Sequence, residues 1–142
     1  MIFLKMLAVL VGIVIILFFF LGLKSQKGGA PGLVAGKLAE CSSKPNCVSS
    51  EPGTQPEKQV APISASMSLI KSAVIGTGGT ITSETDDYIS ATYMSKIFKF
   101  VDDVEVRSEK DGTAHIRSAS RVGYSDRGAN LKRVDEIKKA LK

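Results

Sequence analysis

The stretch FVDDVEVRSEKDGTAHIRSAS, residues 100–120, decides the fold of this 142-residue chain. Apolar and polar residues alternate with a period of two on both sides of its central segment, residues 110–112. A period of two indicates a β-strand, and an Asp-Gly pair between two such runs indicates a hairpin turn. We therefore predict an antiparallel pair of strands over residues 98–108 and 113–124.

The register of this hairpin follows from the side chains that must share a face. In both strands the even-numbered positions hold most of the apolar residues, so we expect the even face to be buried. A three-residue loop, with Gly112 in a left-handed conformation, pairs even positions with even ones. The predicted pairs are Phe100–Val122, Asp102–Ser120, Val104–Ser118 and Val106–Ile116 on the inner face, and Glu105–Arg117 and Arg107–His115 on the outer face.

The inner face of this hairpin carries one carboxylate, Asp102. A buried carboxylate requires hydrogen-bond donors around it, and Ser118, Ser120 and Tyr124 are predicted to lie on the same face. We therefore expect the Asp102→Ala substitution to destabilise the domain strongly. The neighbouring Asp103 is predicted to be exposed and to matter far less.

Arginines cluster in and after the second strand, and arginine side chains are frequent anion ligands. Two interpretations stay open: a structural network whose acids neutralise the arginines, which the sequence favours, and an anion-binding site. The candidate residues for both are Asp102, Arg117, Ser118, Ser120, Arg121, Tyr124, Asp126, Asn130 and Arg133. A third interpretation is an enzyme of unrecognised type that uses Asp102 with Arg117 or Arg121.

Two further strands, at residues 80–84 and 88–95, precede this hairpin, and amphipathic helices at residues 64–75 and 131–141 lie on either side of the strands in the sequence. The predicted order is therefore helix, four strands, helix. We predict an α+β fold, a small two-layer domain in which two helices flank a four-stranded antiparallel meander.

Residues 6–23, MLAVLVGIVIILFFFLGL, contain no charge and lie between Lys5 and Lys24. A helix of this length spans about 27 Å, close to the hydrocarbon thickness of a bilayer. A cleaved signal peptide is the alternative, but no good cleavage site follows, so we predict a retained signal-anchor helix. The expected organisation is a membrane anchor over residues 1–23, a Gly- and Ala-rich flexible tether over 24–40 and a domain over 41–142.

Cys41 and Cys47 are the only cysteines of the chain. An exported chain has reason to pair them, so we predict a Cys41–Cys47 disulfide instead of a metal site. The domain is therefore expected on the extracytoplasmic side of the cytoplasmic membrane, in the periplasm or at the cell surface, held by a single membrane-spanning helix. The modest net charge of +5 suits a position beside an anionic bilayer.

The familiar zinc, hydrolase and nucleotide-binding motifs do not appear in the sequence, and the single histidine, His115, is predicted to be a surface residue. We therefore expect no cofactor and no metal, and we favour a binding or scaffolding module of the cell envelope over an enzyme. The expected partners are the membrane and an anionic lipid, an envelope polymer or an envelope protein. Export excludes nucleic acid.

Three motifs, PNCVSS at residues 45–50, FVDDVEVR at 100–107 and RSASRVGYSDRGAN at 117–130, resemble the signatures of the domain-of-unknown-function 1499 family. The resemblance covers residues 41–142. It implies kinship with exported or membrane-anchored proteins of bacteria and plastids, and it implies no activity and no catalytic residue. Arg127 stands where the family usually has an apolar residue, and Leu131 where it often has an arginine, which argues against a fixed arginine set around the last helix.

Overall fold

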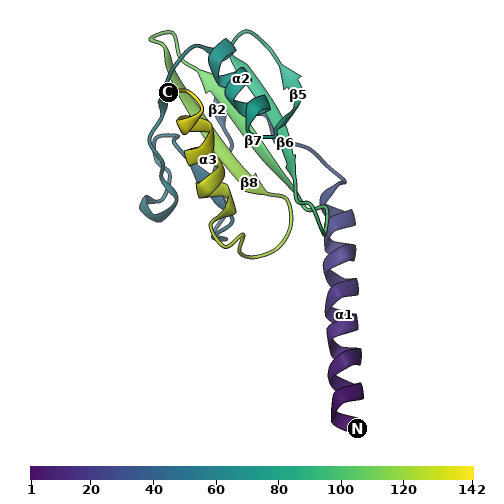
Figure 1. Ribbon diagram of the computed structural model, residues 1–142. Coiled ribbons are helices and arrows are strands. Elements are labelled where there is room, and N and C mark those ends of the chain that lie inside the picture. The colour runs from purple at the N-terminus through teal and green to yellow at the C-terminus, as the bar shows by residue number, and fades with distance from the viewer.

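The apolar N-terminal segment forms helix α1, Ile2–Ser25, which projects away from the rest of the chain (Figure 1). The computed structural model describes all 142 residues. Helix α1 has 24 residues, and it is long and apolar enough to cross a membrane. Its side chains are mostly exposed, but Gly22 and Ser25 near its end are buried against the domain.

Four strands form the predicted antiparallel meander: β5 (Thr80–Glu84), β6 (Tyr88–Met94), β7 (Val101–Ser108) and β8 (Thr113–Ser120). The prediction of a four-stranded sheet is wrong, however, because two short strands, β3 (Cys47–Ser49) and β4 (Ile63–Ser64), pair with the outer edge of β8. The sheet has six strands, in the order β3-β8-β7-β6-β5 with β4 also on β8. Strands of two or three residues are too short to show a period-two pattern.

The predicted register of β7 against β8 is confirmed within both strands. The observed pairs include Asp102–Ser120, Val104–Ser118, Glu105–Arg117, Val106–Ile116 and Arg107–His115. Gly112 has a φ of 87°, the left-handed conformation that the three-residue loop requires. The predicted pair of Phe100 with Val122 lies beyond both strands, since β8 ends at Ser120.

Helices α2 (Met67–Gly76) and α3 (Ala129–Lys139) cover one face of the sheet, the front face in Figure 1. Ser66 caps α2, because its Oγ accepts a hydrogen bond from the backbone N–H of Leu69 at 3.4 Å. A short 3₁₀ helix, η1 (Pro56–Lys58), lies in the segment between β3 and β4. The core fills the space between helices and sheet and consists of Ile63, Ile70, Ala73, Val74, Ala91, Tyr93, Val104, Val106, Ala114, Ile116, Val134 and Ile137.

The other face of the sheet is covered as well, by a hairpin of β1 (Leu33–Val34) and β2 (Lys37–Leu38). Figure 1 shows β2 behind the sheet, on the side away from the helices. Leu38 is only 3% exposed, and the N–H of Gly32 donates a hydrogen bond to Glu105 at 2.9 Å. Residues 24–40, predicted as a flexible tether, therefore include a layer packed on the sheet. The prediction that the odd-numbered face of β7 and β8 is exposed is wrong for the same reason.

Candidate functional site

Asp102 lies on the helix-facing side of β7, as the register predicts, and pairs with Arg133 of α3. Nη2 of Arg133 donates to Oδ2 of Asp102 at 2.7 Å. The guanidinium of Arg133 also lies over the ring of Tyr93, 4.7 Å from its centroid. The ion pair therefore joins the beginning of β7 to α3 at the margin of the core.

Asn130 is fully buried and connects α3 to β8. Its side-chain NH₂ group donates to Oγ of Ser120 at 3.0 Å and to Oδ2 of Asp126 at 2.7 Å. Its Oδ1 accepts from Oγ of Ser118 at 2.6 Å and from Nη1 of Arg133 at 2.7 Å. Both polar atoms of the Asn130 side chain are therefore satisfied within the protein, which is the pattern of a structural network.

Six of the nine predicted network residues meet here: Asp102, Ser118, Ser120, Asp126, Asn130 and Arg133. Arg117 and Arg121 bind acids on the opposite face of the sheet. Tyr124 does not join the network and is 71% exposed, because β8 ends at Ser120 and the alternation of faces ends with it. The structure pairs Asp102 with neither Arg117 nor Arg121, so it does not assemble the enzyme site considered from the sequence.

Buried ion pairs line the opposite face of the sheet. Arg121 donates to both carboxylate oxygens of Asp103 at 2.7 Å each, and Arg117 donates to Oε2 of Glu105 at 3.0 Å. Glu105 has no exposed surface, and its Oε1 also accepts from the hydroxyl of Tyr88 at 2.7 Å. A charged side chain that is buried under a covering layer is stable only when an opposite charge compensates it. Arg121 compensates Asp103, and Arg117 compensates Glu105.

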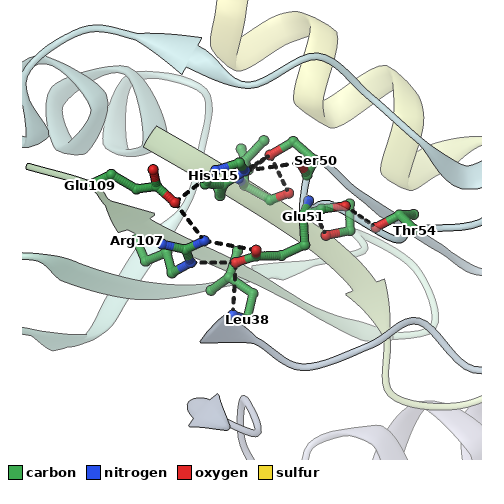
Figure 2. Close-up of polar contacts among 9 residues, drawn as sticks. Leu38, Ser50, Glu51, Thr54, Arg107, Glu109 and His115 are labelled. Carbon is green, nitrogen blue, oxygen red and sulfur yellow. Dashed lines mark hydrogen bonds and ion pairs between the residues drawn. The ribbon is translucent and has the colours of Figure 1, made fainter. Parts of the chain in front are cut away.

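A third ion pair on this face joins Arg107 of β7 to Glu51 in the loop after β3 (Figure 2). Nη2 of Arg107 donates to Oε2 of Glu51 at 2.8 Å, and Nε of Arg107 donates to Oε1. The backbone N–H of Leu38 also donates to Oε1 at 2.9 Å. Glu51 therefore holds both its own loop and the covering hairpin against the sheet.

His115 lies beside this pair and is buried, so the prediction of a surface histidine is wrong. Its Nδ1 lies 2.9 Å from the carbonyl oxygen of Ser50, and its Nε2 lies 3.3 Å from Oε1 of Glu109. Figure 2 shows Glu109 between His115 and Arg107, and Oε1 of Glu109 lies 3.0 Å from Nη2 of Arg107. Both ring nitrogens of His115 therefore have partners within the protein.

The ion pairs also keep these groups in their charged forms. Burial raises the pKa of Glu51, but the hydrogen bonds from Arg107 and from the N–H of Leu38 outweigh it and hold the pKa below its ordinary value of 4.5. The hydrogen bond with Glu51 raises the pKa of Arg107, and the one with Asp103 raises the pKa of Arg121. The lowered pKa of Glu51 and the raised pKa of Arg107 have the same cause, the hydrogen bonds between the two side chains, so each group stabilises the charged form of the other.

A basic groove opens where the chain leaves α1. Its volume is about 280 Å³, and its lining includes Lys27, Gly28, Gly29, Asp103, Arg117 and Arg121. Arg117 and Arg121 pair with acids, whereas Lys27 forms no ion pair. The Nε atom of Arg117 is a buried donor without a hydrogen-bond partner, and no other buried side-chain polar atom shares that condition. Three cationic side chains with one acid in the lining suit an anionic ligand.

Two other hollows are larger and more apolar. One, of about 570 Å³, lies between the covering hairpin and the loop at residues 51–55. It borders the predicted disulfide, which is confirmed: Cys41 and Cys47 are bonded, with Cα atoms 5.6 Å apart. The other, of about 480 Å³, lies between α1 and the loop after β8, and its lining includes Phe18 and Tyr124.

The role of Glu51 could not be predicted from the sequence, because Glu51 lies in a loop with Pro and Gly neighbours and no periodicity. One indirect signal exists. The predicted register places Arg107 opposite His115, so Arg107 has no acidic partner across the strands. An unpaired arginine on a strand face predicts an acid from elsewhere in the chain, but it does not say which one.

The comparison with known families agrees with the three sequence motifs. A family model described as "Protein of unknown function (DUF1499)" matches residues 37–141. No curated protein and no solved structure matches the chain. The matched region includes β2, all six strands of the sheet, both covering helices and the disulfide, whereas Lys27 and α1 precede it. The chain therefore belongs to the DUF1499 family of proteins of unknown function.

Proposed function

We propose that the protein is a single-pass membrane protein whose domain acts as a binding module for an anionic group at the outer face of the cytoplasmic membrane. The basic groove carries this proposal, because its lining brings the exposed Lys27 together with Arg117 and Arg121, three cationic side chains against the single acid Asp103. Arginine and lysine donors are common ligands of phosphate and carboxylate groups.

The size and position of the groove narrow the class of ligand. A volume of about 280 Å³ is at the small end of ligand sites and suits a phosphate-sized headgroup better than a large substrate. Helix α1 ends at Ser25, two residues before Lys27, so a membrane-spanning α1 brings the groove to the level of the lipid headgroups. An anionic phospholipid headgroup is therefore the preferred ligand, and an acidic envelope polymer is a second source of the same chemistry.

Two features support the membrane position that this proposal requires. Helix α1 is long and apolar enough to span a bilayer and exposes most of its side chains. The Cys41–Cys47 disulfide favours the extracytoplasmic side, because disulfides persist in oxidising compartments.

Native mass spectrometry of the full-length protein in mild detergent, with added phosphatidylglycerol or phosphatidylcholine, tests the proposal. We expect the wild type to retain phosphatidylglycerol and the Lys27→Gln variant to retain several-fold less. Lys110→Gln is the matched control, since Lys110 is an exposed lysine of the β7–β8 turn and does not line the groove. Equal retention of the two lipids, or equal losses in the two variants, contradicts the proposal. Displacement of the lipid by a soluble acidic polymer identifies a polymer as the stronger ligand.

A further inference from the structure

The turn between β6 and β7, residues 95–100, lies against α1 (Figure 1). The ring of Phe98 packs against those of Phe18 and Phe19 of α1, with centroid distances of 5.2 Å in both cases. The ring of Phe100 lies 6.1 Å from that of Phe18. These aromatic contacts join the turn to the part of α1 that is apolar on all sides.

Polar and backbone contacts hold the turn at one height along the helix. The N–H of Val101 donates to Oγ of Ser25 at 2.9 Å, and Nη1 of Arg121 donates to the carbonyl oxygen of Ser25 at 3.2 Å. Gly22 approaches the turn so closely that a Cβ on it would lie 1.7 Å from the carbonyl oxygen of Phe98. The turn and the end of α1 therefore form one packed unit.

The height of this unit relative to a bilayer follows from the helix. Lys24 is the first charged residue after the apolar segment and belongs at the headgroup level. Phe18 precedes Lys24 by six positions, so it lies about 9 Å deeper along the helix axis. A ring in contact with Phe18 is therefore below the headgroups, at the upper part of the acyl chains.

The exposed surface of the turn has the composition of a membrane interface. Ile97 is 71% exposed, and Met94 at the end of β6 is also exposed. Lys96 and Lys99 lie beside Ile97 with their side chains exposed as well. Apolar side chains between lysines suit the boundary layer, because the apolar groups enter the acyl region while the ammonium groups reach the phosphates.

We propose that the β6–β7 turn is a second membrane contact of this protein, in addition to α1. In this arrangement Ile97 and Phe98 lie among the upper acyl-chain carbons, and Lys96 and Lys99 lie at the phosphates of anionic lipids. The partner is the bilayer that holds α1, so the inference rests on the proposed membrane anchoring and is independent of the basic groove. Two contacts orient the domain relative to the membrane plane, which one helix alone does not do.

Tryptophan fluorescence tests this placement directly, because the chain contains no tryptophan. The full-length Ile97→Trp variant is reconstituted in nanodiscs of phosphatidylcholine and phosphatidylglycerol, with or without phosphatidylcholine brominated at its upper acyl-chain carbons. We expect a blue-shifted emission that the brominated lipid quenches. Leu69→Trp is the matched control, since Leu69 is similarly exposed but lies on α2, at the opposite end of the sheet from α1 (Figure 1).

A third variant, Leu10→Trp, reports whether α1 is inside the bilayer. Quenching of Leu10→Trp and Ile97→Trp, but not of Leu69→Trp, supports the inference. Quenching of Leu10→Trp alone overturns it and leaves the membrane anchor standing, and the turn then faces water or a protein partner. Absence of quenching in all three variants overturns both the inference and the anchoring on which it rests.

Discussion

Glu51 and Arg107 lie 56 positions apart in the sequence, and their side chains form a two-bond ion pair between the sheet and its covering layer. Their side chains are 8% and 10% exposed, so water compensates neither charge if the other is removed. Removing one partner of a buried ion pair destabilises a protein far more than the intact pair stabilises it, because the other charge is left buried and unpaired.

We expect the Glu51→Gln substitution to lower the free energy of unfolding by about 3 kcal/mol. The guanidinium of Arg107 then retains only the half-exposed Glu109 as an acidic partner. Chemical denaturation of the detergent-solubilised protein measures the loss. Glu57→Gln is the matched control, because Glu57 is exposed in the same region and forms no ion pair. Similar losses in the two variants would show that the buried pair does not stabilise the domain.

The pH dependence of stability provides a second prediction for Glu51. Its pKa in the folded protein lies below the ordinary value of 4.5, so the unfolded chain binds more protons as the pH falls. Ionised Glu51 therefore contributes its full stabilisation at pH values above 4.5. This contribution is lost as the pH falls through the pKa of Glu51 in the folded protein. We expect the melting temperature of the wild type to fall more steeply between about pH 5 and about pH 3 than that of Glu51→Gln. Parallel slopes contradict this assignment.

The neighbours Asp102 and Asp103 yield a prediction that reverses the one drawn from the sequence. Asp103→Asn leaves Arg121 with a backbone carbonyl as its remaining partner, and we expect a loss of about 3 kcal/mol. Asp102→Asn leaves Arg133 bonded to Asn130 and Ser118, so the loss is expected to be about 1 kcal/mol. Thermal melts of both variants decide the order. A larger loss for Asp102→Asn would restore the sequence-based expectation.

Two properties of the disulfide can be measured: whether Cys41 and Cys47 are bonded in the native protein, and how much the bond stabilises the domain. Mass spectrometry of the protein purified without reductant should show Cys41 joined to Cys47. Replacing both cysteines by serine should lower the free energy of unfolding by about 2 kcal/mol, because the loop that the bond closes is small. Two free thiols in protein recovered from its native membrane would remove the main support for the extracytoplasmic side.

Gly22 and Gly12, both on α1, provide a matched pair of helix substitutions. A Cβ on Gly22 collides with the carbonyl oxygen of Phe98, whereas a Cβ on Gly12 meets nothing within 4 Å. We expect Gly22→Ala to release the β6–β7 turn from α1 and to speed amide hydrogen exchange at residues 95–101. Gly12→Ala should leave that exchange unchanged. Equal exchange in both variants would mean that the turn does not need close contact with the helix.

The parts of the fold that the sequence predicted are those that local patterns control. Alternation and the Asp111-Gly112 turn determine the register of β7 against β8, and the spacing of apolar residues reveals both helices. Strands β3 and β4 could not be predicted, because they exist through their pairing with β8 and have no pattern of their own.

The candidate site was predicted less completely, for a related reason. Charged residues at alternate strand positions predict an exposed face, and Asp103, Glu105 and Arg107 follow that pattern. They are buried because residues 26–40 and Glu51 cover them, and contacts between segments so distant in sequence leave no local trace. The alternation of faces predicts Tyr124 in the network only if it continues past Ser120, the residue at which β8 ends.

The covering layer has a consequence for the order in which the domain is completed during synthesis. Leu38 and Glu51 belong to the first part of the domain to be made, but Arg107, the partner of Glu51 in the sheet, follows Glu51 by 56 residues. At about 5–20 residues per second, the ribosome needs roughly 3 to 11 s to supply that partner. The partner of strand β3 is synthesised later still, since β3 pairs with residues 117–119 of β8. The nascent hairpin therefore has no sheet to lie on until the chain is almost finished, and closure of the domain is a late step that depends on contacts of long sequence separation.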